Sequence, residues 1–176
     1  MALHYGGNGM DFISKVDAVI HACENGFAEP ALALALTLPD ICAQIEYPNM
    51  VQVGNRYKLW SNEHIDLCHD DTGNQIKFSG NILYLLRCHF LHSGDGTVDI
   101  TDNSTRFCLM DVNPEIPTRG LMIRVSTFAN GSHMFTINLY QLIDSICSAA
   151  REFYDSWPQK NDFDEHTIDL LNYEDE

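Results

Sequence analysis

Residues 79–92 constrain the fold most, because apolar side chains occupy most of the positions from 82 to 91 in this segment. Its apolar side chains recur on all sides of a helix: Ile82, Leu83, Leu85, Leu86, Phe90 and Leu91. A helix needs about 20 apolar residues to cross a bilayer, so this segment is too short to span a membrane. A helix that is apolar all round must instead be buried by its neighbours. With Ser79 as its N-cap and Gly94 ending it, we expect this helix at the centre of a helical core.

Three further segments in the first half of the chain carry helical patterns. Residues 10–24 and 55–68 each place apolar side chains on one face. Residues 29–46 are rich in Ala and Leu, which are strong helix formers. Pro39 kinks or restarts that helix, and the spacing of Thr37 and Asp40 fits a capping box at the restart.

A β-rich region separates these helices from a last one. Residues 105–110, 121–128 and 133–138 read as strands, and Asn130-Gly131 is a strong signal for a hairpin turn between the last two. Asn138 then opens a strongly amphipathic helix. The fold class predicted is mainly α, a helical bundle with a small antiparallel β-hairpin insertion of two or three strands before the last helix.

We expect residues 1–160 to form a single domain, with the β insertion at about 105–137, followed by an acidic C-terminal tail at 161–176. The tail carries seven acids and no Lys or Arg. It is expected to be solvated or loosely docked, with binding to a partner or to the Arg87 region as the alternative.

Charge limits the partners that the chain can have. The 176 residues include 10 Lys and Arg against 25 Asp and Glu, a formal net charge of −15. Ten cations are too few to form a broad basic surface among 25 acids. We therefore expect any contact with RNA to be weak and local, and we expect no membrane partner. Residues 1–10 resemble no secretory signal, and six widely spaced cysteines suggest reduced thiols, so we expect a cytoplasmic protein.

Arg87 is the residue with the clearest chemical implication. A guanidinium in an otherwise apolar helix is costly unless an anion or a carboxylate satisfies it. His92 follows near the helix end, and histidine can transfer protons at neutral pH. An Arg that contacts a phosphate and a His that moves protons suffice for RNA cleavage by the ribose 2′-OH, without a metal.

A structural role for the same residues is the alternative. Arg87 could pair with Asp40 or Glu46, and His92 could bind the free carbonyls at the helix end. Five residues of regular helix rotate by about 140°, so Arg87 and His92 do not share a face. A site shared between two chains would relax that demand.

The string Arg87-Cys-His-Phe-Leu-His92 resembles the R-x(4–6)-H motif of the HEPN superfamily, and the preceding helices resemble those of a bacterial branch. This resemblance implies a HEPN-like helical bundle, commonly dimeric, with metal-independent ribonuclease activity in a toxin–antitoxin or defence system. Arg87 would contact the scissile phosphate and His92 would act as acid and base in a composite dimer site, yielding a 2′,3′-cyclic phosphate and a 5′-OH. We take His89, Asp40 and Glu46 as supporting residues.

The resemblance implies a homodimer, RNA as substrate and a possible antitoxin protein, and we expect no cofactor and no metal. Cys88, His89 and His92 could offer zinc ligands, but neighbouring residues on a helix point apart. Two other functions remain open: a non-catalytic HEPN-fold dimerisation or interaction module in which Arg87 and His92 are structural, and an acidic inhibitor or decoy of a nucleic-acid-binding protein.

Overall fold

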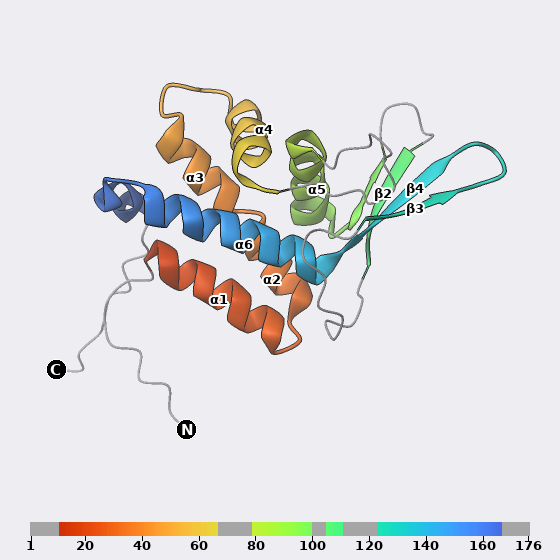
Figure 1. The fold of residues 1–176 in the computed structure, drawn as a ribbon, viewed down its shortest axis with the longest axis horizontal. Coiled ribbons are helices and arrows are strands. Elements are labelled where there is room, and N and C mark those ends of the chain that lie inside the picture. Colours follow the sequence, from red (N-terminus) through yellow and green to blue (C-terminus); the bar gives the residue numbers. More distant parts are fainter. Residues whose placement is uncertain (1–10, 67–78, 100–104, 111–122, 167–176) are drawn as a thin grey trace.

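The computed structural model describes residues 11–66, 79–99, 105–110 and 123–166. The fold is mainly helical, with a small mixed four-stranded sheet (Figure 1). The elements in chain order are α1 Phe12–Glu24, α2 Ala28–Ala35, α3 Leu38–Glu46, α4 Val53–His64, α5 Gly80–Ser93, β1 Thr97–Asp99, β2 Thr105–Met110, β3 Ile123–Thr127, β4 His133–Asn138, α6 Leu139–Ser156 and the 3₁₀ helix η1 Lys160–His166. Within the described ranges, no helix combines the length and the apolar character needed to cross a membrane.

Helix α6 is the central element of the helical body. Figure 1 shows it running between α1 and α2 on one side and α3 and α4 on the other. Its buried residues follow the helical period: Leu139, Leu142, Ile143, Ile146, Cys147, Ala149, Ala150 and Phe153. The predicted cap is confirmed, because the Asn138 side chain accepts hydrogen bonds from the backbone N–H groups of Tyr140 and Gln141 at 3.0 and 3.2 Å.

Helix α5 is not the centre of the core, and that prediction was wrong. Only its first half is buried, whereas His89, Leu91 and His92 in its last turns are exposed. The helix lies between α4 and the sheet, and Ile82 and Leu86 face a small gap that is also lined by strand residues. The first half of α5 is therefore apolar on two sides because different neighbours cover each side.

Thr37 and Ser79 stand at the N-cap positions of α3 and α5 as predicted, but neither side chain makes the expected capping hydrogen bond. The Thr37 side chain caps no N–H group of α3, and its hydroxyl donates instead to the Leu34 carbonyl at 2.7 Å. Ser79 makes no capping hydrogen bond for α5 either. The N–H of Gly80 instead donates to the side-chain oxygen of Asn62 on α4 at 2.7 Å. A side chain distant in the sequence thus satisfies one of the N–H groups in the first turn of α5 that have no partner within the helix.

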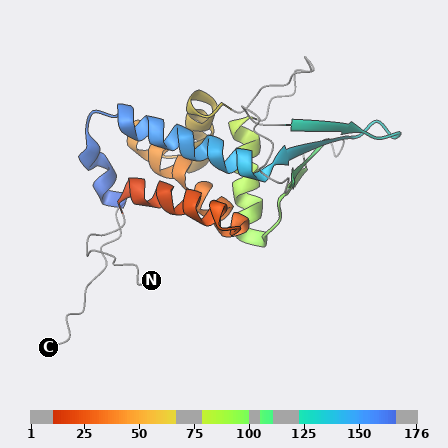
Figure 2. The same ribbon diagram turned by 60° about the horizontal axis from the view of Figure 1, so that its bottom comes forward.

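The sheet is mixed rather than antiparallel. The β3–β4 hairpin turns at Asn130-Gly131 as predicted, with Gly131 at φ +79°, a conformation that favours glycine. The short strand β1 pairs antiparallel with β2, and β2 pairs parallel with β4, giving the order β1-β2-β4-β3. The second strands of the two antiparallel pairs, β2 and β4, thus lie side by side at the centre of the sheet and run in the same direction. Figure 2 shows the β3–β4 hairpin extending away from the helical body.

At the opposite end of the body, η1 follows α6 (Figure 2). Its Phe163 is buried, with ring centroids 4.7 Å from Phe12 and 4.8 Å from Tyr154. The first residues of the predicted acidic tail therefore pack against the body. Residues 167–176 of that tail lie outside the described residues.

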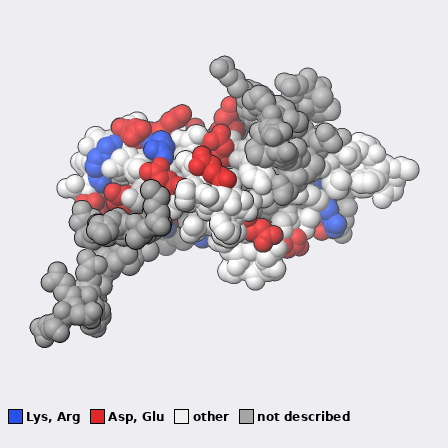
Figure 3. Space-filling model, turned by 90° about the horizontal axis from the view of Figure 1, so that it is seen from below, with Lys and Arg blue, Asp and Glu red and all other residues white. Residues whose placement is uncertain are grey.

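On one face of the described surface, acidic side chains are more widespread than basic ones. In Figure 3, Asp and Glu are spread over this face, whereas the visible Lys and Arg groups lie apart from one another. This distribution agrees with the excess of 25 acids over 10 bases in the sequence. A groove lined with basic residues, which would bind RNA tightly, does not lie on the described part of this face.

Candidate functional site

The position of Arg87 depends on close packing between α4 and α5. Gly80, the first residue of α5, lies against the backbone of α4, where an added Cβ would overlap the Lys58 carbonyl oxygen. The hydrogen bond from the Gly80 N–H to Asn62 fixes the same contact. From this anchor, α5 rises by about 1.5 Å per residue and brings Arg87, two turns later, opposite the first turn of α3.

Arg87 forms an ion pair with Asp40 in the first turn of α3. Both side chains are largely shielded from water, with exposed fractions of 22% for Arg87 and 19% for Asp40. The guanidinium carbon also lies 5.7 Å from the ring centroid of Tyr57 and 6.0 Å from that of Tyr84. The structure thus brings one of the two predicted carboxylate partners to Arg87 and adds two aromatic rings with which a cation interacts favourably.

Burial governs the protonation of this cluster. It raises the pKa of the Asp40 carboxyl, and the nearby guanidiniums of Arg87 and Arg56 offset only part of that rise. Burial also raises the pKa of Tyr57, whose hydroxyl donates to the Leu36 carbonyl at 3.2 Å. Burial therefore disfavours the ionised form of Asp40, even though a guanidinium lies beside it.

Some buried polar atoms of this cluster form no hydrogen bond with the described residues. Three of its buried polar atoms, Asp40 Oδ1, Arg87 Nε and Arg56 Nε, have no hydrogen-bond partner there. Such atoms are uncommon in folded proteins and often mark a site that takes a polar ligand or water. Two of the three are guanidinium donors, the kind of group that binds anions, and all three atoms are shielded from solvent in this structure.

Arg56 is the residue that sequence reasoning missed. It lies on α4, and its guanidinium donates long hydrogen bonds of 3.4 Å to the Met50 carbonyl and to the side-chain oxygen of Gln44. With Arg87 it gives two guanidiniums for one carboxylate, a local positive excess in a chain of net charge −15. The one signal in the sequence was that Arg56 directly precedes the aromatic residue Tyr57 in the helix predicted at 55–68.

The histidines are not brought to Arg87 within one chain. His92 is exposed in the last turn of α5, whereas Arg87 faces α3 and α4. His89 is also exposed and lies near Asp95 and Asp99, whose pKa values are lowered mainly by hydrogen bonds from Thr97 and Arg106 and to a smaller extent by His89. Among the described residues, no hydrogen bond or ion pair joins Arg87 to either histidine. The rotation of about 140° between positions five apart accounts for this separation.

Glu46, the other predicted carboxylate, lies at the far end of α3. Its Oε2 atom is 2.7 Å from Nε2 of His64 on α4, so it is engaged away from Arg87. Of the supporting residues, only Asp40 therefore contacts Arg87. Cys88, His89 and His92 form no metal-ligand grouping in the part of the chain that the structure describes.

Comparisons of this chain with protein-family models, with curated proteins and with solved structures find no match. The resemblance to the HEPN superfamily therefore depends on Arg87, His92 and the helices around them. The functional interpretation has to be argued from the chemistry of the Asp40–Arg56–Arg87 cluster.

Proposed function

We propose that this protein is a metal-independent endoribonuclease of HEPN type that acts as a homodimer. The observation that carries the proposal is the Asp40–Arg56–Arg87 cluster, where Arg87 pairs with the Asp40 carboxylate, Arg56 acts on it electrostatically, and the Nε–H group of each guanidinium is buried without a partner among the described residues. Donors of this kind match the oxygens of a phosphodiester. Because the site is local, it is compatible with the acidic character of the rest of the surface.

In this proposal Asp40 is a positioning residue. Its carboxylate holds one edge of the Arg87 guanidinium, and the remaining donors of Arg87 face the phosphate. Arg87 and Arg56 then neutralise the charge that builds up on the phosphate oxygens as the 2′-oxygen attacks. Fixing the guanidinium beforehand avoids the cost of ordering it during the reaction.

His92 of the partner subunit supplies the proton transfer. It removes the proton from the ribose 2′-OH, and the 2′-oxygen forms a bond to phosphorus while the bond to the 5′-oxygen breaks. The protonated His92 then returns this proton to the departing 5′-oxygen, which leaves a 2′,3′-cyclic phosphate and a 5′-OH and restores the neutral imidazole. A partner-derived histidine is invoked because Arg87 and His92 of one chain face different sides.

The test is RNA cleavage in the presence of EDTA, with analysis of the product ends. The protein is expected to cut RNA and to leave 2′,3′-cyclic phosphates, and His92→Ala is expected to lose at least about a hundredfold in rate. His21→Ala is the matched control, since His21 is likewise exposed in the last turn of a helix, α1. Full activity in His92→Ala, or products that never pass through a cyclic phosphate, would contradict the proposal.

A second candidate is a non-catalytic interaction module with the same helical bundle. The observation that favours it is the ion pair between Arg87 and Asp40, together with the two tyrosine rings around the guanidinium. In that case Arg87 serves to join α5 to α3, and His92 has no chemical role. Absence of cleavage across RNAs of varied sequence and structure, with a folded dimer, would favour this candidate over the ribonuclease.

A further inference from the structure

The C-terminal ends of α3 and α4 bring together three side chains that the Arg87 cluster does not use. Glu46 is the last residue of α3, and Glu63 and His64 are the last two residues of α4. One potential ligand atom from each lies within 4.8 Å of the other two. Oε2 of Glu46 and Nε2 of His64 are already 2.7 Å apart. We name this group the Glu46–Glu63–His64 cluster.

The neighbours of the cluster hold two of its side chains in place. The imidazole of His64 stacks on the buried ring of Trp60, with centroids 4.9 Å apart, and meets the edge of Phe153 at 5.3 Å. The hydroxyl of Tyr47 donates to a carboxylate oxygen of Glu63. Groups that orient ligands in this way are typical of the surroundings of protein metal sites.

The electrostatics of the cluster favour a cation. Two carboxylates and one imidazole lie where two helices end, and the C-terminal end of each helix carries a partial negative charge of roughly half a unit. The pKa of the nearby Tyr47 hydroxyl is raised by burial and, in addition, by the negative charges of Glu46 and Glu63. A divalent ion would compensate this concentration of negative charge, whereas one imidazolium compensates it only in part.

We propose that Glu46, Glu63 and His64 bind a divalent transition-metal ion such as Zn²⁺, which clamps the end of α3 to the end of α4. One imidazole nitrogen and two carboxylate oxygens are ligands that Zn²⁺ accepts at about 2.0–2.2 Å, with water filling the remaining position. The ion replaces the hydrogen bond between Glu46 and His64, so these two atoms move apart by roughly half an ångström to become ligands.

This site is separate from the chemistry proposed for Arg87. Glu46 lies six residues after Asp40 on α3, which is about 9 Å along the helix. The bound ion therefore stabilises the body and takes no part in RNA cleavage. Chelation is expected to lower the thermal unfolding midpoint while leaving any metal-independent cleavage in place, so each proposal can fail without the other.

The experiment is titration of the full chain with Co²⁺ and Zn²⁺. Binding of Co²⁺ at His64 is expected to give visible absorption bands and to quench the fluorescence of Trp60, which stacks on that imidazole. One ion per chain should bind, and Zn²⁺ should raise the unfolding midpoint, because a ligand that binds the folded state stabilises it.

Glu63→Gln and His64→Gln are the test variants, and each is expected to weaken binding about tenfold or more. Glu63 is exposed and its replacement is nearly isosteric, so that variant keeps the fold. Glu24→Gln is the matched control, because Glu24 is an exposed carboxylate at the end of another helix, α1. No binding by the unmodified chain, or unchanged binding in Glu63→Gln and His64→Gln, would overturn the proposal.

Discussion

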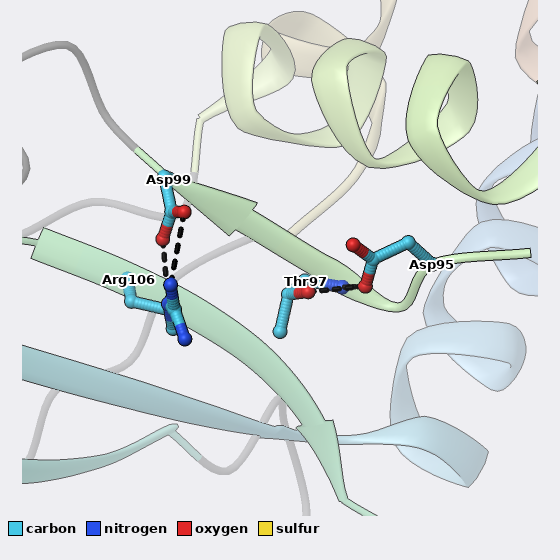
Figure 4. Close-up of polar contacts among 4 residues, drawn as sticks. All are labelled: Asp95, Thr97, Asp99 and Arg106. Carbon is cyan, nitrogen blue, oxygen red and sulfur yellow. Dashed lines mark hydrogen bonds and ion pairs between the residues drawn. The ribbon is translucent and has the colours of Figure 1, made fainter. Parts of the chain in front are cut away.

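Two aspartate–arginine pairs, one in the helical body and one on the sheet, have the same chemistry in different surroundings. Asp40 and Arg87 are 19% and 22% exposed, whereas Asp99 on β1 and Arg106 on β2 are 49% and 57% exposed. The sheet pair is a two-pronged contact, with the Arg106 Nε and Nη2 atoms 2.6 and 3.0 Å from the two Asp99 oxygens (Figure 4).

Because the two pairs differ in exposure to water, the pKa values of their carboxyl groups shift in opposite directions. The hydrogen bond from Arg106 lowers the pKa of Asp99, because the exposed carboxylate loses little solvation. Burial raises the pKa of Asp40, because the attraction of Arg87 does not repay the loss of water. The effect of an ion pair on stability therefore cannot be judged until the burial of its two side chains is known.

The two regions also differ at their glycines, and the largest expected effect lies in the body. Gly80→Ala would place a Cβ onto the Lys58 carbonyl oxygen, a backbone atom that cannot rotate away. We expect a loss of about 3 kcal/mol or more in the free energy of unfolding, because α5 must move away from α4. Urea unfolding followed by circular dichroism measures this loss. A Gly80→Ala protein as stable as the unmodified one would show that the α4–α5 contact is not close-packed.

Arg87→Leu is expected to cost about 2–3 kcal/mol, because it leaves the largely buried Asp40 carboxylate without its partner. The double variant Asp40→Leu with Arg87→Leu should recover much of the loss, because no uncompensated charge remains. Arg106→Leu on the sheet is the matched control, and its effect should be smaller and should shrink further at high salt. Equal losses in Arg87→Leu and Arg106→Leu, measured by urea unfolding, would mean that burial does not distinguish the pairs.

Gly131→Ala tests the sheet region and should have a smaller effect than Gly80→Ala. The space around Gly131 is open, so the cost comes only from placing an alanine at φ +79°, which is about 1 kcal/mol. The measurement is the same urea unfolding experiment. A loss larger than that of Gly80→Ala would contradict the view that packing constrains the body more than the hairpin.

The smallest effect is the opposite pH response of the two aspartates. Because the folded-state pKa of Asp40 is raised, its contribution to stability is complete below its unfolded pKa of about 3.8 and falls as the pH rises through the folded value. Because the folded-state pKa of Asp99 is lowered, its contribution is present above about 3.8 and is lost as the pH falls through the folded value. NMR titration of the carboxyl carbons should place Asp40 above 3.8 and Asp99 below it; the reverse order would refute the assignment.

Local signals in the sequence predicted the local parts of this fold. The apolar period predicts α6, Asn138 predicts its cap, and Asn130-Gly131 predicts the hairpin turn, because each depends on residues that are close in the chain. The pairing of β2 with β4 and the burial of Phe163 depend on tertiary contacts, so no local pattern marks them.

The candidate site follows the same division. The sequence predicted a partner for Arg87, because this residue is a single cation in an apolar helix. Asp40, one of the two expected carboxylates, forms that ion pair in the structure. Arg56 could not be found in this way, because its relation to Asp40 arises only when α4 packs beside α3. The distance between Arg87 and His92 follows from helix geometry, which is why the proposed site needs two subunits.

Mixing two inactive variants tests that two-subunit site most directly. Arg87→Lys keeps a positive charge beside Asp40 but loses the planar fork that contacts phosphate, and His92→Ala removes the acid–base group. Each variant alone is expected to be inactive toward RNA. After exchange of subunits in an equal mixture, about a quarter of the original activity should return, because half of the dimers are mixed and each of these has one intact site. Mixed dimers that form but cut no RNA would contradict a site built from Arg87 of one subunit and His92 of the other.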